Sequence, residues 1–130
     1  MKAPSPSEKA IHKAILQYLR TCSPVPVFVT TVEQGAPTQL ERNRNAGMGV
    51  VAGFPDIMFF CDARAFAFEV KKEGGRTSKK QTEVQRQIRA AGSFAGVVRS
   101  VEDVCEVLDS YGVPLRARPV GMRKAAGASA

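Results

Sequence analysis

Apolar residues recur every three or four positions near the start of the chain, with polar residues between them. This period is typical of a helix that buries one face. The apolar positions are Ile11, Ala14, Ile15, Tyr18 and Leu19. The pattern predicts a helix with Ser5 as its N-cap and Pro6 at its first position, ending near Arg20 before Pro24.

Several shorter segments are rich in Val, Phe, Ile and Ala and have the composition of strands. They are residues 27–33, 56–61, 65–71 and 94–99. A tight turn at Asp62 and Ala63 separates the second from the third, which predicts a β-hairpin.

Two later segments return to helical spacing. Ser78 is the expected N-cap of a helix over residues 79–91, and Gly92 is its stop signal. Ser100 is the expected cap of a last helix that ends before Gly112. The order αβββαβα predicts one α/β domain, with a mixed central sheet flanked by helices, over residues 1–112.

Residues 34–53 show no clear period and contain four glycines. Loops of this length inside compact domains are uncommon, and this one is interpreted either as a functional segment or as a mobile surface loop. Residues 113–130 mix Pro, Gly, Ala and cations and are expected to form a flexible basic tail.

The bulk composition narrows the class of partner. The chain has 130 residues and a formal net charge of +7, with 19 Lys and Arg against 12 Asp and Glu, which favours a polyanion such as nucleic acid. Its three cysteines and single histidine show no zinc or disulfide spacing. Without an apolar leader or membrane-length segment, the chain is expected to work in the cytoplasm and not at a membrane.

The hairpin places charges where a strand usually excludes them. A turn centred between Asp62 and Ala63 puts Asp56 opposite Glu69, and Lys71 shares the face of Glu69. Opposed carboxylates repel unless a cation lies between them, and paired carboxylates suit Mg²⁺ or Mn²⁺. A lysine beside them can orient an attacking water and stabilise charge on a phosphate. The alternative is structural, with these residues at a strand end and on an exposed edge.

The motifs resemble those of a known family. "GFPDI" stands thirteen residues before the glutamate of "FEVKK", and "SKKQ" follows. Together they resemble the VRR-NUC family of the PD-(D/E)XK nuclease superfamily, over most of residues 5–105. The resemblance implies a restriction-endonuclease-like core.

The resemblance also implies roles for individual residues. Asp56 and Glu69 would be metal ligands together with the backbone carbonyl of Val70, and Lys71 would be the catalytic lysine. Gln81 would be the active-site glutamine, and Glu8 the glutamate that the first helix directs toward the metal. From the residues alone, Ser5-x-x-Glu8 and Ser78-x-x-Gln81 are also interpreted as capping boxes, so both interpretations stay open.

Basic residues follow the motif and are expected to bind the DNA backbone near a helix N-terminus. They are Lys72, Arg76, Lys79 and Lys80, with Arg42 and Arg44 in the preceding loop as weaker candidates.

The function implied by the resemblance is metal-dependent hydrolysis of DNA phosphodiester bonds. Free-standing members, typical of phages and bacteria, resemble homodimeric, structure-specific endonucleases that act in repair or recombination on branched DNA such as four-way (Holliday) junctions. The cytoplasm of a bacterium or a phage-infected host is the expected location. The alternatives are a DNA-binding accessory protein that does not cleave, and a restriction-type or RNA-directed nuclease of the same fold.

Overall fold

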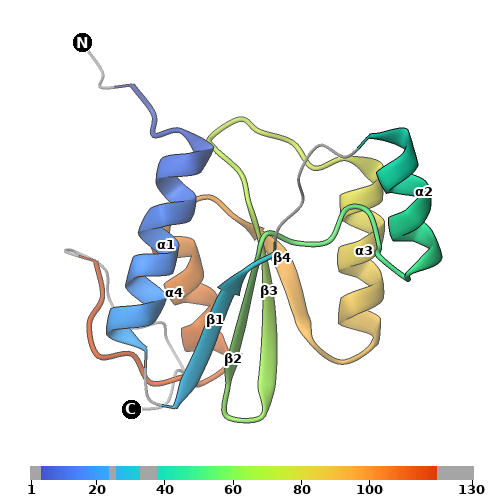
Figure 1. Ribbon diagram of the computed structural model, residues 1–130. Coiled ribbons are helices and arrows are strands. Elements are labelled where there is room, and N and C mark those ends of the chain that lie inside the picture. Colours follow the sequence, from blue (N-terminus) through green and yellow to red (C-terminus); the bar gives the residue numbers. More distant parts are fainter. Residues whose placement is uncertain (1–3, 24–25, 33–37, 120–130) are drawn as a thin grey trace.

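The computed structural model describes residues 4–23, 26–32 and 38–119 (Figure 1). Its elements are α1 (Glu8–Cys22), β1 (Val27–Thr31), α2 (Gln39–Gly47), β2 (Ile57–Cys61), β3 (Arg64–Val70), α3 (Lys79–Ala90), β4 (Phe94–Val98) and α4 (Val101–Ser110). The expected mixed α/β fold and the order of its sheet and flanking helices are confirmed, with α2 as an additional element.

The strands form one mixed sheet in the order β1-β2-β3-β4, antiparallel except for the parallel pair β3 and β4. The predicted hairpin register is confirmed, since Phe60 pairs with Ala65. Asp62 and Ala63 have positive φ angles of 52° and 61°, as a two-residue type I′ turn requires. This turn fixes which residues face each other at the far end of the hairpin.

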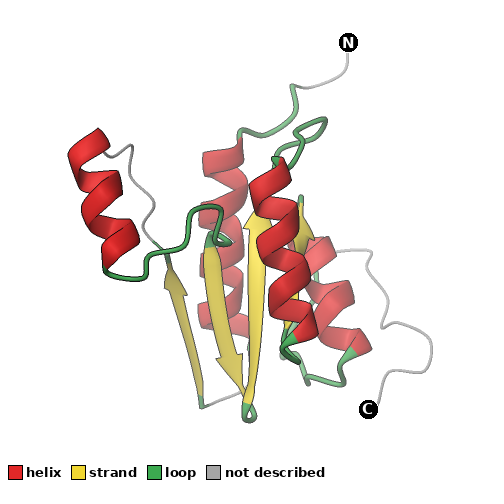
Figure 2. Cartoon of the chain, turned by 90° about the vertical axis from the view of Figure 1, so that its right-hand side faces the viewer, coloured by secondary structure: helices red, strands yellow, loops and turns green. Residues whose placement is uncertain are grey.

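Helices cover both faces of the sheet (Figure 2). α1 and α4 lie on one face, where the core is built from side chains such as Ile15, Leu19, Phe59, Phe68 and Leu108. α3 lies on the other face and packs against β4. β3 therefore has both faces covered, which is why most of its residues are buried, the charged Glu69 included.

The start of α1 differs from the sequence-based expectation. Its N-cap is Ser7, whose Oγ accepts a hydrogen bond from the amide of Ala10 at 3.1 Å. Ser5, the predicted cap, instead donates to the carboxylate of Glu73 at 2.6 Å. Glu8 is therefore the first residue of the helix, and its predicted capping box with Ser5 is wrong.

The segment predicted as an irregular loop contains a short helix, α2. Thr38 caps it by accepting from the amide of Glu41 at 3.1 Å, and Gln39 donates to Asn43 at 2.9 Å. The helix lacks an apolar period because every one of its side chains that the structure describes is exposed. The sequence of α2 therefore has no apolar periodicity that would predict a helix.

The first part of the predicted tail packs on the domain. Val113 is buried, and the amide of Arg116 donates to the carbonyl of Cys22 at 2.8 Å. The guanidinium of Arg118 donates to the buried carboxylate of Asp109 at 3.2 Å. These contacts tie residues 113–119 to α1 and α4, whereas residues 120–130 lie outside the described residues.

Within the described ranges, none of the helices combines the length and the apolar character that crossing a bilayer requires.

Candidate active site

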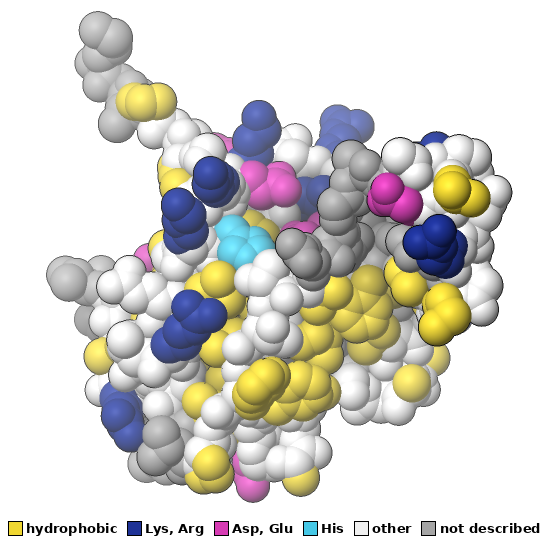
Figure 3. All heavy atoms as spheres, viewed as in Figure 1, with side chains coloured by type: hydrophobic (Ala, Val, Ile, Leu, Met, Phe, Trp, Pro, Cys, Tyr) yellow, Lys and Arg dark blue, Asp and Glu magenta, His cyan; other side chains and the backbone are white. Residues whose placement is uncertain are grey.

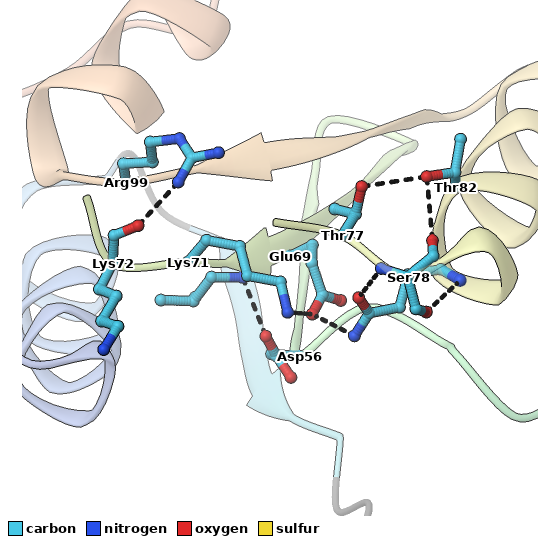
Figure 4. A network of polar contacts seen from close by, with 10 residues as sticks. Asp56, Glu69, Lys71, Lys72, Thr77, Ser78, Thr82 and Arg99 are labelled. Carbon is cyan, nitrogen blue, oxygen red and sulfur yellow. Dashed lines mark hydrogen bonds and ion pairs between the residues drawn. The ribbon is translucent and has the colours of Figure 1, made fainter. Parts of the chain in front are cut away.

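Asp56 stands just before β2 and is held across the hairpin from β3. Its Oδ2 accepts a hydrogen bond from the amide of Val70 at 2.9 Å, and its own carbonyl accepts from the amide of Val32 at 2.7 Å. The contact to Val70 shows that the predicted register extends past the last strand pair. Asp56, Glu69 and Lys71 consequently converge at one end of the sheet (Figure 4).

Glu69 is almost fully buried, with 2% of its surface exposed. Its Oε1 accepts a hydrogen bond from Nε2 of Gln81 at 3.0 Å. Its Oε2 is buried without a hydrogen-bond partner among the described residues. Because a buried oxygen without a partner costs free energy, this atom fits a position that binds a cation.

The surroundings of Glu69 disfavour its ionised form. Burial is the main cause, the nearby Asp56 adds to it, and together they raise the pKa of Glu69 to about 8, although Lys71 acts in the opposite direction. Glu8 also contributes to raising this pKa. A divalent cation would supply the charge that stabilises the ionised carboxylate.

Lys71 brings a cation to the same place. Its Nζ lies 3.7 Å from Oε1 of Glu69, and only 13% of its side chain is exposed. Its amide donates to the carbonyl of Val98 at 3.1 Å, which continues the parallel pairing one residue beyond the strand. In Figure 4, Lys71 points toward the carboxylates, whereas Lys72 points away from them.

Gln81 forms the capping box of α3 and also contacts Glu69. The backbone amide of Gln81 donates to Oγ of Ser78 at 3.1 Å, and its side-chain Oε1 accepts from the backbone amide of Ser78 at 2.9 Å. These two hydrogen bonds form the capping box of α3. The remaining polar atom of the Gln81 side chain, Nε2, donates to Glu69. The start of α3 therefore also orients the buried carboxylate.

Glu8 lies on the opposite side of Asp56 from α3. Together with Asp56 it borders a hollow of about 520 Å³ between α1 and the end of β1. Since Ser7 caps the helix, capping does not account for Glu8. Its role toward a metal therefore stays a prediction.

The backbone carbonyl of Val70 faces the same side of β3 as Asp56. In an extended strand the N–H and C=O of one residue point to the same side. Because the amide of Val70 donates to Asp56, its carbonyl also faces the Asp56 side of β3.

The oxygen donors at this end of the sheet fit a hard divalent cation. Asp56, Glu69, the Val70 carbonyl and Glu8 supply carboxylate and carbonyl oxygens, the donors that Mg²⁺ and Mn²⁺ prefer. No cluster of at least three His, Cys, Asp or Glu side chains in metal-binding proximity occurs within the described part of the chain. Any such site would therefore rely on the backbone carbonyl and on water.

The basic residues expected to contact DNA are exposed beside this site. Lys72 and Arg76 lie in the connection after β3, and Lys79 and Lys80 lie in the first turn of α3. The guanidinium of Arg99 donates to the carbonyl of Lys72 at 2.7 Å and fixes the start of this connection.

The other basic candidates lie on a separate element. Arg42 and Arg44 are exposed on α2, which projects from the body of the domain in Figure 2.

Gly53 has a positioning role that residue spacing does not reveal. Its φ is +83°, and a β-carbon there would lie 3.0 Å from the carbonyl carbon of Lys80 and 3.1 Å from the amide of Gln81. The segment leading to Asp56 thus packs directly on the first turn of α3. Only the resemblance of "GFPDI" to a family motif marked this glycine in the sequence.

Among the comparisons with known proteins, the comparison with solved structures gives a match. Neither the protein-family models nor the curated protein sequences contain a match. A solved structure described as a VRR_NUC domain protein matches with a TM-score of 0.66 and 19% sequence identity, covering 85% of this chain and 90% of that chain. The chain therefore has a VRR-NUC-like fold, as the resemblance of its motifs implied.

We predict that Gly53→Ala is more harmful than the matched change Gly49→Ala. Both glycines have positive φ, +83° and +85°, so both variants pay roughly 1–2 kcal/mol of backbone strain. A β-carbon at Gly49 meets no atom within 4 Å, whereas one at Gly53 collides with α3. Gly53→Ala should lose about 1–3 kcal/mol more unfolding free energy in urea. Equal losses would contradict the packing argument.

The raised pKa of Glu69 predicts a pH dependence of stability without metal. Between the ordinary carboxyl pKa and about 8, folded Glu69 keeps a proton that the unfolded chain has released. Stability from this group is complete below that window and is lost as the pH rises through it. In a chelator, the Tm of the wild type should therefore fall relative to that of Glu69→Gln as the pH rises from 5 to 8. Parallel curves would show that Glu69 ionises normally.

Proposed function

We propose that this protein is a Mg²⁺- or Mn²⁺-dependent DNA endonuclease that cleaves branched DNA such as four-way junctions. The observation that carries the proposal is the buried Oε2 of Glu69, which has no hydrogen-bond partner among the described residues and lies beside Asp56 and Lys71. A protein that only binds DNA gains nothing from opposed carboxylates next to phosphates. The VRR-NUC-like fold supports the same activity.

The metal would be held by Asp56, Glu69 and the Val70 carbonyl, with Glu8 as a further donor. A bound Mg²⁺ or Mn²⁺ lowers the pKa of a coordinated water and offsets charge on the phosphate. Gln81 holds Glu69 in a fixed orientation through its hydrogen bond at 3.0 Å.

Lys71 supplies the cation that the chain itself brings to the reaction. Its ammonium lies at the carboxylates, with only 13% of the side chain exposed. There it would orient the attacking water and stabilise the negative charge that grows on the phosphate.

The nucleic acid would be held by the basic surface around the start of α3. Lys79 and Lys80 stand in its first turn, where backbone amides and the helix dipole also favour phosphate. Lys72 and Arg76 extend this surface along the preceding connection.

The preference for branched DNA and the homodimer rest on the resemblance of the sequence motifs to the VRR-NUC family. A symmetric dimer would place two sites on two strands, as paired incision of a junction requires. An apolar surface over β1 and β2 supports self-association, with Phe28 61% and Phe60 42% exposed (Figure 3). β1, an edge strand of the described sheet, also carries no charged residue or proline that would block pairing.

We expect Lys71→Met to reduce kcat by at least about 10²-fold on a labelled four-way junction with Mg²⁺, because it removes the ammonium from the carboxylates. Lys72→Met is the matched control, since Lys72 points away from the carboxylates. It should raise KM and largely retain kcat. Unchanged kcat in Lys71→Met would remove Lys71 from the mechanism.

The same assay separates the alternatives when it includes linear duplex, RNA, Mn²⁺ and a chelator. Cleavage that needs metal and is confined to the junction supports the full proposal. Equal cleavage of duplex and junction removes the preference for branched DNA, and cleavage of RNA alone favours an RNA-directed enzyme. Binding without any cleavage would favour an accessory protein.

For the dimer, we expect light scattering to give twice the monomer mass for the wild type. The double change Phe28→Ser and Phe60→Ser should give a monomer with an unchanged far-UV circular dichroism spectrum, because both rings are exposed and no core is lost. A monomeric wild type would remove the homodimer from the proposal.

A further inference from the structure

The hollow between α1 and the end of β1 is lined mainly by residues to which the proposed mechanism gives no role. Its volume is about 520 Å³, and Asp56 and Glu8 border it on the side of the candidate active site. Lys9, His12 and Lys13 of α1 and Thr31 of β1 also line it. The hollow therefore opens next to the proposed metal ligands, on the side away from α3.

The basic side chains of this hollow come from α1. His12 and Lys13 stand three and four residues after Lys9, the spacings that bring helix side chains to the face of Lys9. Both lysines are exposed. Figure 3 shows Lys and Arg side chains near the histidine on this face of the molecule.

His12 is held in place within the hollow. Its Nε2 and Oγ1 of Thr31 are 2.9 Å apart and form a hydrogen bond that joins α1 to β1. The ring is half-buried, unlike the exposed lysines on either side of it. The wall of the hollow nearest the sheet is therefore a fixed polar surface.

Once Asp56 and Glu8 are assigned to the proposed metal, the remaining charged groups of the hollow, Lys9 and Lys13, favour an anionic ligand. Asp56 and Glu8, the acidic groups of the hollow, are oxygen donors for the proposed metal. The lysines have no such role, and no ion pair joins either of them to an acid within the described residues. A nucleic acid that passes over the carboxylates meets Lys79 and Lys80 on the α3 side, and the hollow on the α1 side.

We propose that this hollow binds the backbone phosphate adjacent to the one that is cleaved, with Lys9 and Lys13 as its cations and His12 as part of its fixed wall. The inference rests on the proposed nuclease function and extends it to a second side of the substrate. The nucleic acid would then cross the site from the first turn of α3 to the first turns of α1.

Binding measurements test the contact directly. In a Lys71→Met background, which prevents turnover, the double change Lys9→Ala and Lys13→Ala should weaken DNA binding about tenfold in fluorescence anisotropy. The slope of log K against log salt should fall by about 1, as for the loss of one phosphate contact. Arg20→Ala, in the last turn of the same helix, is the matched control and should change neither quantity.

A chemical probe identifies the phosphate. Neutral methylphosphonate is placed singly at each phosphate flanking the cut. One adjacent position should slow cleavage by the otherwise wild-type protein, and the same position should have no further effect when Lys9 and Lys13 are replaced. The proposed subsite would be overturned if the methylphosphonate and the lysine replacements had additive effects on cleavage at every position. It would also be overturned if the double variant bound DNA as the Arg20→Ala control does.

The outcomes also separate this inference from the proposed function. If the wild type neither binds nor cleaves nucleic acid with Mg²⁺ or Mn²⁺, both fail. If it cleaves and the hollow variants behave as the Arg20→Ala control, only the subsite fails. If the double change Lys9→Ala and Lys13→Ala weakens binding of inorganic phosphate but leaves DNA binding unchanged, the hollow is a general anion site. That result would also overturn the subsite.

Discussion

The burial of the Glu69 carboxylate is the constraint on which the rest of the site depends. A carboxylate that is 2% exposed, with one oxygen unpartnered among the described residues, is expensive to maintain in a small domain. The surrounding structure limits this cost on one oxygen only, through Gln81 and Lys71. The other oxygen stays available, so the fold accepts a loss of stability at the position where a cation would restore it.

The same constraint explains how α3 is placed. Ala65 and Ala67 precede Glu69 on the face that α3 covers, and their small side chains leave room for the helix. Gly53 lets the segment before Asp56 approach the backbone of the first helical turn. Gln81 then joins the cap of α3 to Glu69. Asp56 and Glu69 are therefore positioned by one packed unit, although Asp56 precedes β2 and Glu69 lies in β3.

The hairpin and its charges were predictable because they depend on local rules. The turn at Asp62 and Ala63 fixes the register, and side-chain alternation then brings Asp56 and Glu69 together. Other features depend on tertiary contacts that no spacing encodes. Serines at positions 5 and 7 both suit an N-cap; in the structure Ser7 caps α1 and Ser5 contacts Glu73. α2 buries no face, and the approach of Gly53 to α3 joins segments that periodicity treats separately.

The protein carries a net positive charge, whereas the candidate active site gathers acidic side chains. This contrast links the binding of the proposed metal to that of the nucleic acid. The chain carries a net +7, yet Asp56 and Glu69 lie together, with Glu8 on the hollow beside Asp56, where a phosphate would have to approach. Without a cation Glu69 keeps a proton, and the acidic groups of the site offer a polyanion no attraction. With a cation they become a binding surface, bordered by the lysines of α3 and, in the proposed subsite, those of α1. Because such coupling is reciprocal, metal and nucleic acid would each strengthen the binding of the other.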